Sequence, residues 1–350
     1  MAHVILLADY RRGFWFSTKS VHTTESLDAE RIRKELEVLG HDVEIVNFAE
    51  LDLSKSDLVG SFVLYTSSED VGGLYKRFIE AKIFGLKMVG AHPVPEPELL
   101  LAHHDKVMME SVRQARLGEA LGQPWSWTFG SLEDFVAADV AVPVVLKPAT
   151  GAGSRGVSLA RDPKQAARAA RKLSRSMDMP GTFFELAKRL RRRHYVPRSL
   201  HRRPFVLQQF LPGLQGDYKV LRLGRRFYIL GRANRPNDFR ASGGGRLNYA
   251  PHKDIDVTPI LDAAADWAEA LGSPFCSLDV AYDPQLEQGP QLIEFQCVNF
   301  GPVTAENSFC YYTRNSSGWE RIEEQCDFEM VFAEAASEHI NRVVPSIGSL

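Results

Sequence analysis

The sequence is poor in cysteine, and its few thiols form no motif. Four cysteines are spread through the last quarter of a 350-residue chain: Cys276, Cys297, Cys310 and Cys326. Zinc sites and disulfide frameworks use closely spaced or paired cysteines, and no Cys-x-x-Cys pair occurs here. The spacing therefore argues against a zinc site and predicts reduced thiols in a cytoplasmic protein.

Long apolar runs and an excess of one charge are also missing. No run approaches the roughly 20 residues that span a membrane, and residues 1–8 are too short for a signal peptide. A formal net charge of −2 offers no global basic surface for nucleic acid. With 44% hydrophobic and 25% charged residues, the composition predicts a globular protein of two or three domains, compatible with a homodimer and with no membrane partner.

The most informative stretch joins a lysine to a glycine-rich loop between two short apolar runs. The first run ends at Lys147, and the second starts at Val157. Between them lie the small residues Gly151, Gly153, Ser154 and Gly156. Glycine lets backbone N–H groups approach an anion closely, and a lysine adds positive charge, so the stretch is suited to binding phosphates.

The flanks of this loop decide between several kinds of phosphate loop. A dinucleotide-binding fingerprint needs a helix directly after the last glycine, but residues 157–160 alternate as a strand does. A Walker loop would close on Lys followed by Ser or Thr, and a kinase would add His-Arg-Asp and Asp-Phe-Gly. No Lys followed by Ser or Thr closes this loop, and neither kinase motif occurs in the chain. Two interpretations stay open: a lid hairpin over a triphosphate, and a surface hairpin rich in glycine.

The apolar periodicity divides the chain into three parts. Strands over 3–8, 43–48 and 61–65 alternate with helices over 26–39 and 73–84, which predicts a parallel α/β domain over residues 1–100. A proline-rich boundary then opens a second part, 101–204, that contains the glycine-rich loop. In the third part, 205–350, we expect a hairpin over 217–223 and 226–232, strands over 277–282 and 291–295, and a closing helix over 322–343.

Two carboxylates interrupt apolar strands in the third part. Asp279 and Glu294 are each flanked by apolar residues, and Gln296 follows Glu294 on the same strand face. A carboxylate in such a strand is costly unless it is paired or bound to metal. The pattern favours an oxygen-rich Mg²⁺ site, and the alternative is pairing with a buried arginine such as Arg232 or Arg240.

Two segments concentrate positive charge. Residues 186–204 contain eight Lys and Arg residues, which is typical of a solvated insertion or mobile loop, with an anionic substrate or nucleic acid as the alternatives. Residues 9–24 follow the first strand, where open α/β sheets place ligands, and they include Arg11, Arg12 and Lys19. We expect one of these three to anchor a substrate carboxylate, against the alternative of a solvated loop.

The order of these features resembles the ATP-grasp superfamily, most of all the branch with glutathione synthetase, D-alanine–D-alanine ligase and the glutamate-adding ligases. The resemblance covers roughly residues 100 to 305 and is carried by Lys106, Lys147, the glycine-rich loop, Leu207-Gln208-Gln209-Phe210, Asp217-Tyr218-Lys219, Arg232-Ala233-Asn234, Asp238-Phe239-Arg240, Asp279 and Glu294-Phe295-Gln296. It implies a mixed α/β and α+β chain, in which an ATP-grasp fold follows an N-terminal parallel α/β domain.

The resemblance also implies an activity and assigns residues to it. ATP would lie between two α+β subdomains and phosphorylate a carboxylate, and an amine would attack the acyl phosphate. Lys106, Lys147 and residues 151–157 would hold the phosphates, while Leu207, Gln208, Gln209 and Phe210 would line the adenine pocket. Lys219 and Arg232 would meet the phosphates, Arg240 would steady the acyl phosphate, and Asp279 and Glu294 would bind Mg²⁺.

Two positions depart from the family pattern. The family usually has Asn at the position of Gln296, so the second metal ligand is either Gln296 or Asn299. The adenine-side strand often offers a glutamate where this chain has Gln208 and Gln209. The sequence thus predicts an ADP-forming carboxylate–amine ligase that uses ATP and Mg²⁺ and acts on an amino acid or small peptide-like acid. The alternatives are an ATP-grasp phosphotransferase, an acid–thiol ligase or a nucleotide-binding regulator without catalysis.

Overall fold

The structure is a computed structural model that describes residues 1–14, 26–67, 73–121, 125–151, 155–176, 179–236, 238–241, 246–298 and 300–347. It divides into two compact units. Unit 1 contains residues 1–103 and 214–350, and unit 2 contains residues 104–213. None of the described helices is long and apolar enough to cross a membrane.

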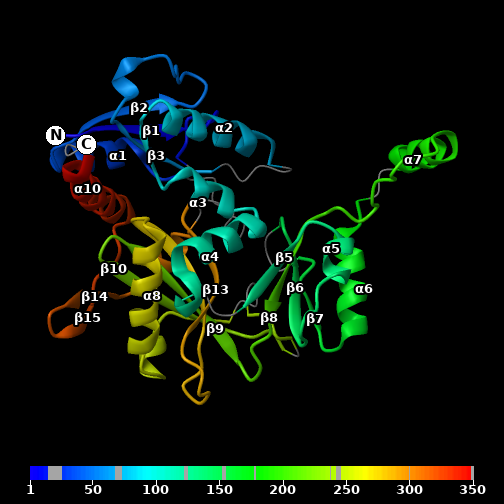
Figure 1. The fold of residues 1–350 in the computed structure, drawn as a ribbon. Coiled ribbons are helices and arrows are strands. Elements are labelled where there is room, and N and C mark those ends of the chain that lie inside the picture. The colour runs from blue at the N-terminus through cyan, green and yellow to red at the C-terminus, as the bar shows by residue number, and fades with distance from the viewer. Residues whose placement is uncertain are drawn as a thin grey trace. The chain divides into compact units, whose positions relative to one another are not determined.

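Unit 1 begins with a parallel sheet in the strand order β2-β1-β3-β4 (Figure 1). Its elements are β1 (His3–Ala8), α1 (Ala29–Val38), β2 (Asp42–Asn47), a short 3₁₀ turn η1 (Ser56–Leu58), β3 (Phe62–Tyr65), α2 (Leu74–Met88), β4 (His92–Val94) and α3 (Pro97–Ala102). The predicted parallel α/β arrangement is confirmed. β1 is buried along almost its whole length, because its apolar run lies between two neighbouring strands.

The rest of unit 1 is an antiparallel sheet in the order β13-β12-β9-β10-β14-β15, with β11 paired to β10. Its elements are β9 (Gly216–Leu223), β10 (Arg226–Ala233), β11 (Leu247–Asn248), η2 (Pro251–Lys253), α8 (Thr258–Leu271), β12 (Phe275–Ala281), β13 (Gln291–Gln296), α9 (Val303–Glu306), β14 (Tyr311–Asn315), β15 (Gly318–Ile322) and α10 (Phe328–Ile347). The closing helix therefore starts at Phe328, since the residues up to Ile322 form a strand instead.

One apolar core joins the two ends of the chain within unit 1. Val4 and Leu6 of β1 belong to the same buried cluster as Leu221 of β9 and Phe332 of α10. Polar contacts lie beside this core, because His41 Nε2 is 2.8 Å from Ser337 Oγ on α10. Burial of these side chains explains why the first hundred residues and the last 137 form one unit.

Unit 2 is a four-stranded sheet in the order β5-β8-β6-β7 with helices beside it. Its elements are α4 (Lys106–Leu121), β5 (Ser126–Phe129), α5 (Leu132–Val136), β6 (Val144–Pro148), β7 (Ser158–Ala160), α6 (Pro163–Ser174), α7 (Met179–Arg191) and β8 (Phe205–Gln209). β8 pairs with both β5 and β6, which places it in this unit rather than with the residues that follow it.

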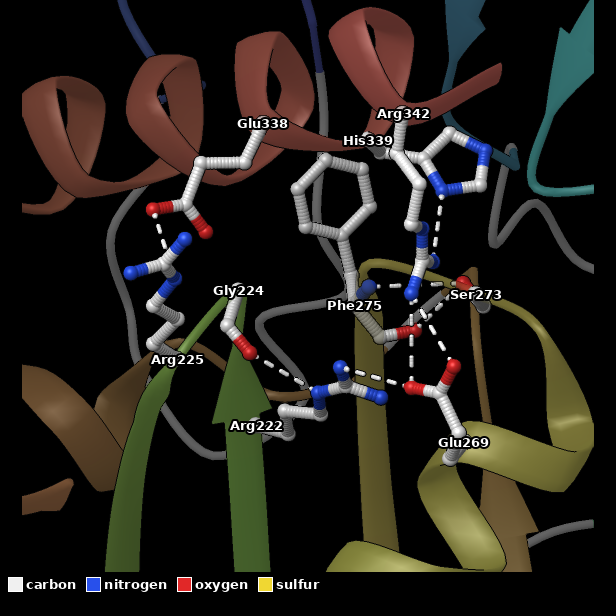
Figure 2. Close-up of polar contacts among 9 residues, drawn as sticks. All are labelled: Arg222, Gly224, Arg225, Glu269, Ser273, Phe275, Glu338, His339 and Arg342. Atoms are coloured by element: carbon white, nitrogen blue, oxygen red, sulfur yellow. Dashed lines mark hydrogen bonds and ion pairs between the residues drawn. The ribbon is translucent and has the colours of Figure 1, made fainter. Parts of the chain in front are cut away.

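Helix α10 carries a half-buried histidine whose titration affects stability. His339 lies beside Arg342 of the same helix, which in turn reaches Glu269 of α8 at 3.0 Å (Figure 2). Burial and the positive charges of Arg342 and Arg222, only partly offset by the carboxylates of Glu269 and Glu96, lower the pKa of His339 to about 4. The neutral ring is therefore the form that the folded unit favours.

We expect His339 to make the protein less stable as the pH falls. The unfolded chain binds a proton near pH 6.5 and the folded chain only near pH 4, so roughly 2 kcal/mol of folding free energy is lost across that window. Urea unfolding at pH 6.5 and 4.5 should show a smaller loss for His339→Gln than for the unsubstituted chain. His3→Gln serves as the control. Equal losses in His339→Gln and the unsubstituted chain would contradict the prediction.

Candidate functional site

Charged side chains from three neighbouring strands share one face of the antiparallel sheet in unit 1. Glu294 of β13 lies opposite Asp279 of β12, and Asp279 lies opposite Lys219 of β9. Because alternate residues of a strand point to the same face, Asp217 joins Lys219, and Gln296 joins Glu294. Strand pairing thus places the predicted metal ligands Asp279 and Glu294 beside the predicted phosphate-binding Lys219, and Asp217 lies on the same face.

Arg232 binds two of these carboxylates at once. It stands opposite Asp217 in the β9–β10 hairpin, with its Nε 2.6 Å from Asp217 Oδ1, and its Nη2 lies 2.8 Å from Asp279 Oδ2. Lys219 Nζ donates to Ser277 Oγ at 2.9 Å and lies 3.9 Å from Asp279 Oδ1. Pairing of Asp279 with Arg232, the alternative that the sequence left open, is present in the structure.

The pKa values of this cluster are strongly shifted. Burial raises the pKa of Asp217 to about 6, against the opposing pull of Arg232. Burial likewise lowers the pKa of Lys219, although Asp279 favours its charged form. For Arg232, burial disfavours the charge, but Asp279 and Asp217 outweigh it and raise the pKa. Shifts of this kind, gathered in a half-buried polar patch, are typical of functional sites.

The donor atoms of this face suit a magnesium ion. The three carboxylates of Asp217, Asp279 and Glu294 outnumber the cations Lys219 and Arg232 by one, so the cluster has a net negative formal charge that attracts a further cation. Carboxylate oxygens are the ligands that Mg²⁺ prefers. In the part of the chain that the structure describes, no three His, Cys, Asp or Glu side chains converge as a ready metal cage. The residues therefore fit a metal held by Asp279 and Glu294 together with oxygens of a substrate.

Gln296, predicted as a metal ligand, is hydrogen-bonded through both polar atoms of its side chain. Its side-chain Nε2 donates to Glu294 Oε1 at 3.1 Å, and its Oε1 is hydrogen-bonded to Nδ1 of His103. Both polar atoms of the amide thus have partners within unit 1. Asn299, the alternative second ligand, lies outside the described residues.

In unit 2, the two predicted phosphate-binding lysines lie beside the glycine-rich segment and the strand predicted to line the adenine pocket. Lys147, on β6, donates from Nζ to Gln208 Oε1 at 2.7 Å. Lys106, the first residue of α4, donates from Nζ to the carbonyl oxygen of Gly151 at 2.9 Å. Gly151 has a φ of 121° and Gly156 one of 74°, backbone conformations that favour glycine. Gly153 and Ser154 lie outside the described residues.

The strand predicted to line the adenine pocket is β8 with the residue after it. Leu207 is in the apolar core of unit 2, so its side chain faces away from solvent. The backbone N–H of Gln209 donates to the carbonyl of Trp125 at 2.8 Å, and Phe210 N–H donates to Pro143 at 3.4 Å. The residues directly before β5 and β6 therefore accept from these backbone N–H groups, and the contacts of Gln208, Gln209 and Phe210 with adenine stay predictions.

Charge is distributed very unevenly between the units. Residues 104–213 contain 19 Lys and Arg residues against 9 Asp and Glu residues, a formal charge of +10, which leaves −12 for unit 1. The net charge of the whole chain is only −2, because the charges of the two units nearly cancel. A strongly positive unit that contains Lys106, Lys147 and a glycine-rich segment is suited to attract a polyphosphate.

Arg240 occupies a loop of unit 1 together with an acidic partner. Its Nε lies 2.9 Å from Asp238 Oδ1, and its Nη2 lies 2.5 Å from Asp238 Oδ2. The Asp238 carboxylate raises the pKa of Arg240, so the guanidinium is charged and held in one orientation. The backbone N–H of Arg235 also donates to the carbonyl of Arg240 at 3.0 Å. Asp238 therefore fixes the orientation of the Arg240 guanidinium, and the role of Arg240 toward an acyl phosphate stays a prediction.

The residues predicted to anchor the acid follow the carboxyl end of β1. Asp9 is buried there, and its carboxylate accepts from Arg11 Nε at 2.9 Å and from Arg11 Nη2 at 2.7 Å. Arg12 is exposed and has a φ of 59°. Lys19 lies outside the described residues. Arg11 is thus already paired with a carboxylate. Of the two described arginines, the exposed Arg12 is the better candidate to bind the carboxylate of a substrate.

The basic insertion is partly helical rather than an irregular loop. Residues 186–191 belong to α7, which Figure 1 shows projecting away from α5 and α6 of the same unit. Glu185 of α7 accepts from the hydroxyl of Tyr195 and from the backbone N–H of Arg198, at 3.1 Å for the latter. The chain after the helix is tied back to it by these bonds. Arg189 and Arg191 are exposed, as expected of a solvated basic face.

Asp217, Ser277 and His103 lie in this cluster or in contact with it, but the sequence analysis assigned none of them a role. Asp217 carried a signal, because a tight turn at Gly224 fixes a hairpin register that sets residue 217 opposite 232. Ser277 lies two residues before Asp279 and so shares its face. His103 had no such signal, since it comes from a different part of the chain and meets Gln296 only in the folded unit.

No protein-family model matches the sequence, and no curated protein matches it either. Solved structures do match. An ATP-grasp protein with a RimK domain from Sphaerobacter thermophilus is 16% identical, with 96% of this chain and 99% of that chain covered and a TM-score of 0.50. D-cycloserine synthetase DcsG is 15% identical, with 97% and 100% covered and a TM-score of 0.52. The VanG D-Ala:D-Ser ligase from Enterococcus faecalis is 13% identical, with 98% of each chain covered and a TM-score of 0.51. At such identities the likeness is one of fold.

Proposed function

We propose that this chain, which has the ATP-grasp fold, is an ATP-dependent, ADP-forming ligase that joins a carboxylate to an amine. The observation that carries the proposal is the row Glu294, Asp279 and Lys219 across three paired strands, with Arg232 bound to Asp279. A row of this kind combines the metal-binding carboxylates and the phosphate-binding cations that phosphoryl transfer needs on one surface. Solved ligases of the same fold support it.

The residues of unit 2 would bind the nucleotide. Lys106 and Lys147 would neutralise its phosphates, and backbone N–H groups of the segment that includes Gly151 and Gly156 would donate to them. The side-chain oxygen of Gln208, which accepts from Lys147, would hold that ammonium group in place. The formal charge of +10 on this unit would favour the encounter with a polyanion.

The residues of unit 1 would act on the transferred group. Asp279 and Glu294 would hold magnesium, whose charge, when it is bound, offsets the charge on the phosphate oxygens. Lys219 and Arg232 would bind the same oxygens. The substrate carboxylate would attack the γ-phosphorus and displace ADP, and the amine would then attack the acyl carbon and displace phosphate. Arg240, held by Asp238, would stabilise the charge that develops on the carbonyl oxygen.

The test is a screen for ADP release with pools of amino acids and small carboxylates. Acid-dependent ADP formation, together with a hydroxamate when hydroxylamine replaces the amine, is the expected result. AMP as the product would overturn the proposal, and a stable phosphorylated acid would indicate a phosphotransferase. Hydroxamate formation followed by turnover only with thiols would indicate an acid–thiol ligase. Nucleotide binding without ADP release in any pool would indicate a regulator.

We expect the segment after β1 to set the affinity for the acid. Arg12→Asn should raise KM for the acid about tenfold or more and leave KM for ATP unchanged, since it removes a charge-assisted hydrogen bond. Asparagine is chosen because it tolerates the positive φ of this position. Arg11→Ala should act less strongly, because Arg11 is bound to Asp9, and Lys19→Ala completes the set. Normal KM values in all three variants would place the acid site elsewhere.

A further inference from the structure

His103 contacts the proposed metal-binding row, although no sequence motif contains it. It is the residue that ends α3, and its backbone N–H bonds to the carbonyls of Leu99 and Leu100. Leu99, Leu100 and Ala102 of that short helix are buried almost completely. The backbone at His103 is therefore held by the core of unit 1, and its ring has a defined position from which to contact Gln296.

The contacts of Gln296 allow one orientation of its amide. Glu294 presents carboxylate oxygens, which only accept hydrogen bonds when ionised, so the amide nitrogen must face Glu294. The amide oxygen then faces His103, which means that His103 must donate from Nδ1. The result is a directed chain of two hydrogen bonds, from the His103 ring to the Gln296 amide and from that amide to the Glu294 carboxylate.

We propose that His103 is a positioning residue, which orients Gln296 so that its amide aligns the Glu294 carboxylate to receive a divalent cation. The inference rests on the proposed function. It replaces the expectation from the sequence that Gln296 is itself a metal ligand, because Gln296 then acts through Glu294. Groups hydrogen-bonded to metal ligands fix their orientation, and their loss typically weakens metal affinity about 10- to 100-fold. The amide oxygen of Gln296, already accepting from His103, is not presented to the metal.

Two variants of His103 separate its hydrogen bond from its bulk. His103→Phe keeps an aromatic ring and removes the donor, whereas His103→Asn offers an amide N–H close to the position of Nδ1. Mn²⁺ binding is measured in the presence of ADP, from the loss of the free-ion signal in electron paramagnetic resonance. This measurement needs no turnover. We expect His103→Phe to weaken Mn²⁺ binding about tenfold or more and His103→Asn to restore most of it. His3→Phe, at a histidine that pairs with Glu44 instead, is the matched control.

Gln296→Asn tests the opposite assignment. The shorter side chain removes the link to His103 but keeps an amide oxygen of the kind that a direct ligand would use. Positioning by His103 predicts weaker Mn²⁺ binding in Gln296→Asn, similar to that in His103→Phe. If Gln296 is instead a direct ligand, Gln296→Asn should bind Mn²⁺ as tightly as the unsubstituted protein, and His103→Phe should bind it equally or more tightly. That pair of results would overturn the inference.

Measurements on the unsubstituted protein distinguish a failure of this inference from a failure of the proposed function. If the unsubstituted protein binds Mn²⁺ and ADP but never releases ADP from ATP, the proposed ligase activity is wrong. The Mn²⁺ affinities of the His103 variants then still decide the positioning role of His103. A folded protein that binds no Mn²⁺ with ADP would overturn the inference together with the metal assignment. Equal thermal unfolding midpoints across the variants would show that the differences arise at the site.

Discussion

Glu294→Gln is expected to lower turnover at least about a hundredfold. The substitution keeps the size of the side chain and its position opposite Asp279, but it removes one of the two carboxylate charges proposed to hold magnesium. Loss of that charge removes several kcal/mol of transition-state stabilisation, and each 1.4 kcal/mol corresponds to about a factor of ten in rate. The measurement is ADP release at saturating ATP over a range of Mg²⁺ concentrations.

The matched control is Glu320→Gln. Glu320 is an exposed residue of β15, at the opposite edge of the same sheet, where it accepts from Asn315. We expect it to leave ADP release within about twofold of the unsubstituted protein, as is usual for surface changes away from a site. If folded Glu294→Gln releases ADP as fast as Glu320→Gln does, the metal assignment is wrong.

Much of the proposed metal-binding row could be predicted because its signals are local. A carboxylate within an apolar strand is conspicuous in any sequence, and Asp279 and Glu294 both stand in this way. The β9–β10 hairpin could also be predicted from the sequence, since a turn at Gly224 joins two apolar strands. Alternation along a strand then placed Gln296 on the face of Glu294 without any knowledge of the fold.

The partners of these residues could not be predicted in the same way. Asp279 meets Lys219 because β12 pairs with β9, and no property of either strand alone specifies that neighbour. His103 reaches Gln296 across nearly two hundred residues of sequence, through a unit built from both ends of the chain. Such contacts follow from the packing of one apolar core, to which Leu6 and Phe332 both belong, whereas periodicity shows only which faces are apolar.

Arg240→Ala is the second change with a large expected effect. In the proposed reaction, negative charge develops on the acyl oxygen as the amine attacks, and a fixed guanidinium stabilises that charge without having to reorganise. Asp238 provides the fixing, with contacts to two nitrogens of Arg240. Removal of one such donor typically costs about 10²–10³ in kcat. We therefore expect a loss of that size in kcat, with KM for ATP little changed.

Three further variants show whether fixation of the guanidinium matters as well as its charge. Arg240→Lys keeps the charge and loses the two-nitrogen contact with Asp238, and Asp238→Asn keeps Arg240 but removes its ionic partner, so both should fall between Arg240→Ala and the unsubstituted protein. Arg225→Ala is the matched control, because Arg225 is 81% exposed and pairs with Glu338 on α10 (Figure 2). Its kcat should be unchanged. If Arg240→Ala keeps the kcat of Arg225→Ala, Arg240 does not contact the reacting group, and another cation must stabilise the intermediate.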